Sequence, residues 1–235
     1  MSTKTQGQAL TDLRAQLDEQ NVSAKFWQDS ELFQYINDGV RDIARRAEVI
    51  LSFNMTLNAI AGQAKYNLPP DVIRVHRCEY IPAGQTQVYP VVGSTYDELD
   101  QIWGINPTTQ SSYPSVYACW GTPGQMTIQF YPVPAQPAQI NLYYYAMPVD
   151  LATDGSQSAS LLNVPQGWED LLVKYAVARA FLKMRDPSWE LFQRLYEDNL
   201  QHLVEVTRQA HDNGRYIQTM TGYVPQWLYA FADES

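Results

Sequence analysis

The sequence is short of cysteine and of charge. Its 235 residues include two cysteines, and 17% of the residues are charged. Two cysteines are too few for a disulfide scaffold. The 16 basic residues are outnumbered by 25 acidic ones, which gives a net charge of −9. Because a protein that clamps nucleic acid needs a basic face, this balance argues against that class of protein.

Long hydrophobic runs are missing as well. No stretch approaches the ~18–20 apolar residues of a membrane span, and the first twenty residues lack the apolar core of a signal peptide. Hydrophobic residues still make up 45% of the chain, enough for a substantial core. With 16 tyrosines and 6 tryptophans beside so few charges, we expect a protein that is made and used in solution and partly covered by other chains.

Residues 1–50 carry the periodicity of two helices. Leucines at helical spacing predict a short helix over residues 8–20, and a second helix begins at Asp29 or Ser30, either of which can cap its first turn. The apolar stripe of the second helix consists of Leu32, Ile36, Val40, Ile43, Ala47 and Ile50. A solvated face and a contact with an acidic partner are both compatible with the three arginines beside that stripe, Arg41, Arg45 and Arg46.

Residues 51–151 have the pattern of an antiparallel β region. Runs rich in β-branched and aromatic residues alternate with glycine and proline turns, as in sandwiches and barrels. Residues 94–100 read as a short capped helix within it. One hairpin is especially clear, because two such runs flank a turn made of Gly121, Thr122, Pro123 and Gly124. The candidate strands are residues 51–58, 72–81, 87–92, 115–120, 126–131 and 140–146.

Residues 152–213 predict a helical hairpin after a polar linker. A stripe that starts at Trp168 ends near Arg185, and Asp186-Pro187 begins a second long helix that should stop at Asn213-Gly214. Four amphipathic helices need partners for their apolar stripes. We therefore expect an α+β fold, in which the N- and C-terminal helices form a bundle with the β region inserted and residues 214–235 form an extended C-terminal arm.

The sequence offers no constellation of catalytic or metal-binding residues. His76 and Cys78 are two apart on a predicted strand and should share a face, but a zinc site needs three or four ligands. Acidic pairs such as Asp97 and Glu98 are explained by the helix dipole. Phosphate-binding loops and nucleophile elbows are missing. We expect no enzyme activity, no cofactor and no metal.

Aromatic residues of the β region allow a second hypothesis. Tyr143, Tyr144 and Tyr145, together with Trp120 and Tyr131, could form a platform for stacking a sugar or a base. On alternating strands, however, half of such residues fill the core. The residues leave both readings open, with the core favoured.

The C-terminal arm is unusually aromatic for a chain terminus. Glycine and proline interrupt its helical period, and so many apolar side chains should not stand free in water. The arm either folds back on its own helices or docks onto another chain, as a segment with spaced aromatic anchors can. The anchors are Tyr216, Ile217, Tyr223, Trp227, Leu228, Tyr229 and Phe231.

The order of these elements resembles a known family. A helix ELFQYINDGVRDI is followed by KYNLPPDVIRV, by the hairpin with its terminal Pro-Val-Pro, by INLYYYAMPVDL and by two helices split at Asp186. Over about residues 31–203 the chain resembles the head-to-tail adaptor, or connector, proteins of tailed bacteriophages, of the tubular-tail and portal adaptor type.

That resemblance implies a structural role in the virion, at the head–tail junction. Such adaptors form a ring, commonly of twelve copies, below the portal, and DNA passes through the lumen without specific binding. The C-terminal arm would reach the portal protein, and the β region, with residues 121–124 at its hairpin tip, would meet the next tail component, a nozzle or tail tube. Assembly would take place in the host cytoplasm, with no membrane involved.

Two other classes stay open. A glycan-binding tail or surface module would use the aromatic residues of the β region, and its melting temperature would respond to sugar. A cell-wall hydrolase would depend on one carboxylate whose substitution abolishes activity and leaves the fold intact.

Overall fold

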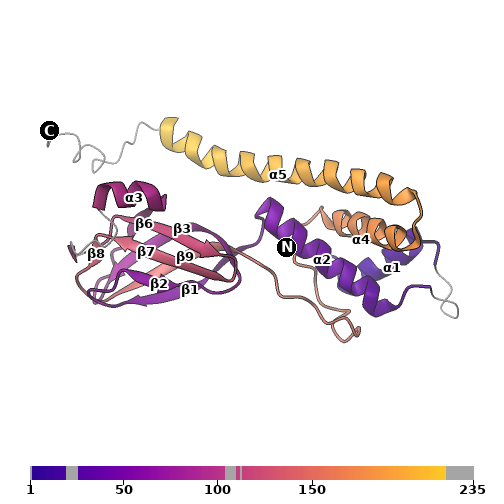
Figure 1. Cartoon of the computed structure of the whole chain (residues 1–235), viewed down its shortest axis with the longest axis horizontal. Helices are drawn as coiled ribbons and strands as arrows, with labels where there is room; N and C mark the ends of the chain where they lie inside the picture. Colours follow the sequence, from indigo (N-terminus) through magenta and orange to yellow (C-terminus); the bar gives the residue numbers. More distant parts are fainter. Residues whose placement is uncertain (1, 20–25, 104–109, 112, 221–235) are drawn as a thin grey trace.

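The computed structural model describes residues 2–19, 26–103, 110–111 and 113–220. The chain is elongated and mixed α+β, which confirms the predicted fold class at that level (Figure 1). A helical region at one end contains α1 (Gln6–Gln16), α2 (Asp29–Ala47), α4 (Glu169–Met184) and α5 (Ser188–Met220). A β region at the other end contains strands β1 to β9 and the short helix α3 (Tyr96–Trp103).

Local capping explains where the helices begin and end. Thr5 and Gln8 form a reciprocal capping box at the start of α1. The helices α2 and α4 stop at Glu48 and Arg185, both of which adopt the left-handed conformation. The Asp186 side chain accepts a hydrogen bond from the backbone N–H of Ser188 at 2.8 Å, so it caps α5 as the sequence predicted.

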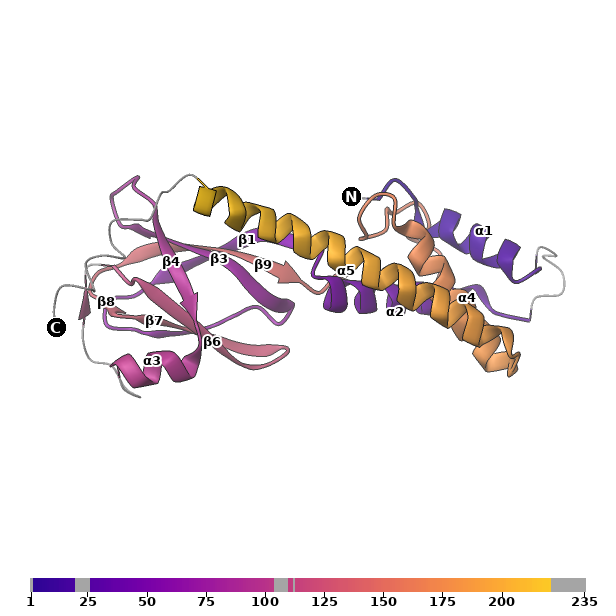
Figure 2. The same ribbon diagram turned by 90° about the horizontal axis from the view of Figure 1, so that it is seen from above.

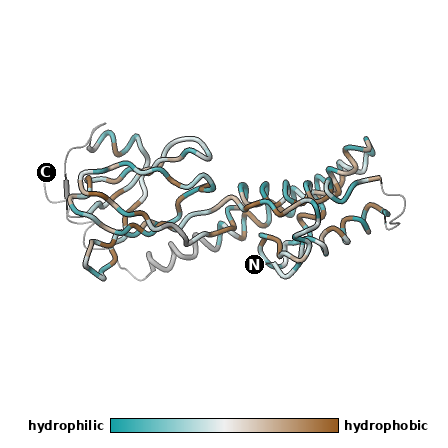
Figure 3. Tube along the Cα trace, turned by 90° about the horizontal axis from the view of Figure 1, so that it is seen from below, coloured by the Kyte–Doolittle hydropathy of each residue, from teal (hydrophilic) through white to brown (hydrophobic). Residues whose placement is uncertain are grey.

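Residues from all four helices of the helical region form one hydrophobic cluster. Leu13 of α1, Ile36 of α2, Leu172 of α4 and Leu200 of α5 are each fully buried in it. Gly39 lets α2 approach α4 closely, because a Cβ there would lie 3.1 Å from the Tyr175 ring and 3.2 Å from Leu172. In Figure 3 hydrophobic and hydrophilic residues alternate along these helices, as expected for helices buried on one side.

Seven strands form a curled sheet in the order β1-β9-β3-β4-β6-β7-β2. They are β1 (Leu51–Ala59), β2 (Lys65–Asn67), β3 (Val72–Pro82), β4 (Tyr89–Ser94), β6 (Val116–Thr122), β7 (Gln125–Tyr131) and β9 (Ala138–Ala146). The two-residue strands β5 (Gln110–Ser111) and β8 (Val133–Pro134) form a small second sheet. Buried residues of β2, β3, β7 and β9, among them Tyr80, Phe130 and Ile140, fill the interior of the curl.

Two departures from the sequence prediction concern pairing and helix length. The β region is not purely antiparallel, because β4 pairs with β6 in parallel and β5 pairs with β8 in parallel. The connection from β4 to β6 contains α3, and such a crossover permits parallel pairing. The helix α5 continues through Asn213-Gly214 to Met220. One glycine costs a helix only about 1 kcal/mol, so it does not stop a long helix by itself.

The two regions are joined by two chain crossings and a few polar contacts. Arg74 of β3 forms an ion pair of 2.5 Å with Glu48, which follows α2. The backbone N–H of Ala146 donates a hydrogen bond to the carbonyl oxygen of Ile50 at 2.9 Å. Figures 1 and 2 show α5 running from the turn after α4, along the helical region, toward the β region. A long helix therefore spans much of the molecule.

Candidate interaction surfaces

The hairpin predicted from the sequence is the β6–β7 pair. Thr122 pairs with Gln125 next to the turn, and residues 121–124 are all exposed. Gly121 has a φ of +119°, and a Cβ there would lie 2.4 Å from the carbonyl oxygen of Gln125. Only glycine fits that position without strain. The hairpin therefore presents a short, uncharged tip whose backbone is tightly specified.

The base of the same hairpin is buried on both faces. Ile128 and Phe130 point into the interior of the curled sheet. On the other face, Ala118 and Tyr131 are fully buried under Leu99 of α3. Strand alternation accounts for one buried face; the second face is buried because α3 packs on β6, a contact that local pattern does not reveal.

The three consecutive tyrosines do not form a shared stacking platform. Tyr144 points into the sheet interior, whereas Tyr143 and Tyr145 belong to the opposite face. Tyr145 is only 3% exposed, and Tyr131 is fully buried. Tyr143 is partly exposed, but its hydroxyl donates to Glu79 at 3.1 Å and Arg77 lies over its ring at 5.8 Å. Most of the proposed sugar-binding face is therefore core.

The predicted pairing of His76 with Cys78 on one strand face is wrong. A β-bulge between Val75 and Arg77 shifts the alternation of β3, so His76 is exposed and Cys78 is fully buried. Burial raises the pKa of the Cys78 thiol. Within the described part of the chain, no three His, Cys, Asp or Glu side chains are placed to hold a metal ion.

Of the two acidic residues at the start of α3, Asp97 and Glu98, the second caps the helix. Glu98 accepts hydrogen bonds from the Ser94 hydroxyl at 2.6 Å and from the backbone N–H of Thr95 at 3.2 Å. These bonds lower the pKa of Glu98, the Ser94 hydroxyl contributing most. The Thr95 hydroxyl in turn accepts from the backbone N–H of Glu98 at 3.3 Å, so the two residues form a capping box at the start of α3. The helix dipole also favours an ionised carboxylate at this position.

The three arginines of α2 are all engaged within the chain. Arg41 forms ion pairs with Asp38 and, at 2.7 Å, with Asp150 of the segment after β9. Arg45 pairs with Asp42 at 2.8 Å. Arg46 donates to Glu197 of α5 at 2.6 Å and 3.0 Å. Arg41 and Arg46 therefore hold α2 against later segments of the chain, whereas Arg45 pairs within α2.

A polar cluster fastens α2 to α5. The buried Tyr196 donates from its hydroxyl to Asp42 at 2.7 Å, beside the Arg46–Glu197 pair. Burial alone would raise the pKa of Asp42, but the hydrogen bonds from Tyr196 and Arg45 and the charge of Arg46 lower it. The hydrogen bond from Arg46 likewise lowers the pKa of Glu197.

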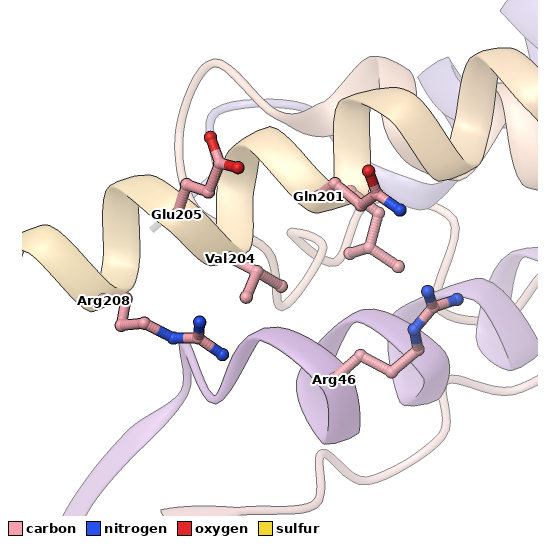
Figure 4. Close-up of a pocket in the computed structure, with 6 residues that line it drawn as sticks. Arg46, Gln201, Val204, Glu205 and Arg208 are labelled. Carbon is pink, nitrogen blue, oxygen red and sulfur yellow. The ribbon is translucent and has the colours of Figure 1, made fainter.

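A cleft of about 390 Å³ opens next to this cluster, between the end of α2 and the middle of α5. Figure 4 shows Val204 and Arg208 pointing from α5 toward α2, with Arg46 reaching up from α2 and Glu205 pointing away. Sequence reasoning missed this cleft, because it arises where two distant segments pack. Its lining residues are Arg46, Leu200, Gln201, Val204, Glu205 and Arg208.

The predicted arm lies largely outside the described residues. Tyr216 and Ile217 fall in the last turns of α5, and nothing more is described for them than the helical backbone. Tyr223, Trp227, Leu228, Tyr229 and Phe231 lie beyond the described part of the chain.

The structure is that of an elongated α+β protein, and its distinctive features are the exposed tip of the β6–β7 hairpin and the long helix α5. Among the described residues, no helix is long and apolar enough to cross a membrane. The family model of the SU10 adaptor protein matches residues 4–220, which covers both the helical and the β region. The chain belongs to the SU10 adaptor protein family, and this membership indicates a structural adaptor protein of a phage. No curated protein matches the sequence.

Proposed function

We propose that the chain is a virion protein that forms a homo-oligomeric ring, a dodecamer in the simplest case, between the portal of the phage capsid and the tail. Family membership across residues 4–220 carries this proposal, because it spans every helix and strand of the fold. The low proportion of charged residues fits a protein whose sides are interfaces between copies. The ring gives the DNA a channel at the head–tail junction.

The DNA passes the ring without being bound specifically. A chain with a net charge of −9 repels phosphate groups, which suits a channel through which DNA must slide. The arginines of α2 do not contradict this, since each is paired with a carboxylate of its own chain. The protein carries out no reaction and needs neither cofactor nor metal for this role. It is assembled in the host cytoplasm without a membrane.

Two elements contact the partners on either side of the ring. The C-terminal arm docks on the portal protein through its anchors Tyr216, Ile217, Tyr223, Trp227, Leu228, Tyr229 and Phe231. The uncharged tip at residues 121–124 contacts the next tail component, a nozzle or tail tube. An exposed tip on a base that is buried on both faces is a rigid contact, which costs little entropy on binding.

Light scattering of the chain with its cognate portal tests this function. The intact chain should add the mass of a ring to the portal. A full-length variant with Trp227→Ser and Tyr229→Ser should add little, since two aromatic anchors are lost. Thr122→Ala, at the opposite contact, is the matched control and should add the same mass as the intact chain. A portal whose mass never changes would exclude the adaptor role.

The glycan-binding alternative has weaker support. Its platform would need exposed aromatic rings, whereas Tyr131, Tyr144 and Tyr145 are buried. A melting temperature that rises with added sugar would favour it over the adaptor role.

A further inference from the structure

The cleft between α2 and α5 combines an apolar floor with a cation. Leu200 is fully buried at the bottom, and Val204 packs beside it against the hydrophobic cluster of the helical region. Arg46 and Arg208 reach into the opening from opposite helices (Figure 4). Such a site suits a large apolar or aromatic side chain.

The two arginines of the cleft differ in the ion pairs that they form. Arg46 is held by Glu197 and Asp42, which fixes its position. Arg208 is exposed, and it forms no ion pair within the part of the chain that the structure describes. Its guanidinium group points toward α2 (Figure 4), and a planar cation stacks well on an aromatic ring.

We propose that the occupant of this cleft is the C-terminal segment of the same chain, with Trp227 on Arg208 and Val204, before the chain meets a partner. The segment of residues 221–235 contains five large aromatic or aliphatic anchors beyond its start and neither lysine nor arginine. Nothing in it repels the two guanidinium groups. Indole is the aromatic ring with the strongest attraction for a cation.

The reach of the segment permits Trp227 and excludes Tyr223. Arg208 lies twelve residues before Met220, which is about 18 Å along a helix at 1.5 Å per residue. Trp227 follows Met220 by seven residues, which span up to about 23 Å when extended. Tyr223 follows by three residues and spans only about 10 Å, too short for Val204, which lies sixteen residues before Met220, about 24 Å along the helix. Of these two anchors, only Trp227 can occupy the cleft of its own chain.

The C-terminal arm would then have two alternative binding sites, which are the cleft of its own chain and the portal. This proposal rests on the proposed function: a portal that binds the same anchors would release the arm from the cleft. A copy that has not met a portal keeps its aromatic anchors covered, which lowers the exposed apolar surface and opposes premature association.

Fluorine NMR of the full-length chain labelled with 5-fluorotryptophan tests the resting site without a portal. The chain has six tryptophans, and Trp227→Phe assigns the signal of interest. The Trp227 signal should lie away from that of free indole and should be shielded from a dissolved paramagnetic agent. Arg208→Ala should lower the ratio of seated to free arm by about 3- to 30-fold, the range of a cation–π contact. Arg194→Ala is the control, since Arg194 is exposed on α5 outside the cleft.

A second control uses the arm itself. Tyr223→Ala should leave the Trp227 signal unchanged, because Tyr223 cannot reach the cleft. A Trp227 signal that is fully accessible in the unmodified chain would overturn the proposal, as would equal effects of Arg208→Ala and Arg194→Ala. A shielded signal that weakens on dilution, with a dimeric mass, would assign the cleft to the arm of a second copy and would also overturn it. None of these outcomes depends on whether the chain binds a portal.

Discussion

The helical region and the β region each have a hydrophobic core, but they differ in the ion pairs that supplement it. In the helical region, ion pairs connect each helix to a segment far away in the sequence, such as Lys183 with Glu31 and Arg46 with Glu197. In the β region, the ion pairs among the described residues are Arg77 with Glu79, two residues apart on β3, and Arg74 with Glu48 at the junction with the helical region. Aromatic side chains contribute much of the interior there. The comparison indicates a polar framework sensitive to pH at one end and an apolar scaffold for exposed turns at the other.

The largest expected effect separates the two cores. Phe130→Ala removes a fully buried ring from the β region, and Leu172→Ala removes a fully buried side chain from the helical region. Each should destabilise its own region by roughly 2–5 kcal/mol, since truncating a buried side chain loses transfer energy and leaves a cavity.

Hydrogen exchange measured by mass spectrometry shows where each loss falls. Phe130→Ala should speed exchange in β3, β7 and β9, whereas Leu172→Ala should speed it in α2, α4 and α5. Exchange that rises equally in both regions for both variants would mean that the two regions unfold as one unit, against the comparison.

The next effect concerns the turn of the exposed hairpin. Gly121→Ala should destabilise the β region by about 1–3 kcal/mol, because a Cβ meets the Gln125 carbonyl at 2.4 Å and the backbone has a positive φ. Gly84→Ala is the matched control: its φ is +77°, but a Cβ there has nothing within 4 Å. Thermal unfolding should show a smaller loss, about 1 kcal/mol, for the control.

A smaller effect is expected at the polar cluster of the helical region. Tyr196→Phe removes the hydroxyl that donates to Asp42 and should cost about 1–2 kcal/mol, because a hydrogen bond to a carboxylate is lost. Urea unfolding followed by helix content measures this cost. Arg194→Ala, on an exposed turn of α5, should change the midpoint little. Equal midpoints for Tyr196→Phe and the unmodified chain would show that the cluster does not hold α5.

Protonation of carboxylates in the helical region should have the smallest effect on stability near neutral pH and a larger one in acid. The pKa values of Glu31, Asp42, Glu169 and Glu197 are all lowered in the helical region. Their contribution to stability is complete above the ordinary carboxyl pKa of about 4 and is lost as the pH falls through the lowered values. Hydrogen exchange between pH 6 and pH 2, corrected for intrinsic rates, should therefore rise in α2 and α5 before it rises in β3 and β9. The reverse order would contradict the comparison.

The sequence predicted the helical region better than the β region, and the reason is the range of the interactions. The stripe from Leu32 to Ala47 predicts α2 because helical neighbours lie three or four residues apart. The parallel pairing of β4 with β6 joins segments separated by α3, and no local pattern encodes it. The three-residue strand β2 is too short for an alternation to be visible.

The candidate surfaces follow the same rule. The hairpin tip at residues 121–124 was predictable, since a turn is read from adjacent residues. The separation of His76 from Cys78 was not, because it depends on a bulge in the pairing with β9. The cleft at Arg208 was also hidden, because Arg46 and Arg208 are brought together only by the packing of α2 on α5.

The central claim is that the chain forms a ring between portal and tail, and single-particle imaging of the chain mixed with its portal tests it most directly. The account predicts a closed ring made of many copies of the chain, seated on one end of the portal. Images that show the portal alone, or the chain bound as scattered single copies, would contradict it.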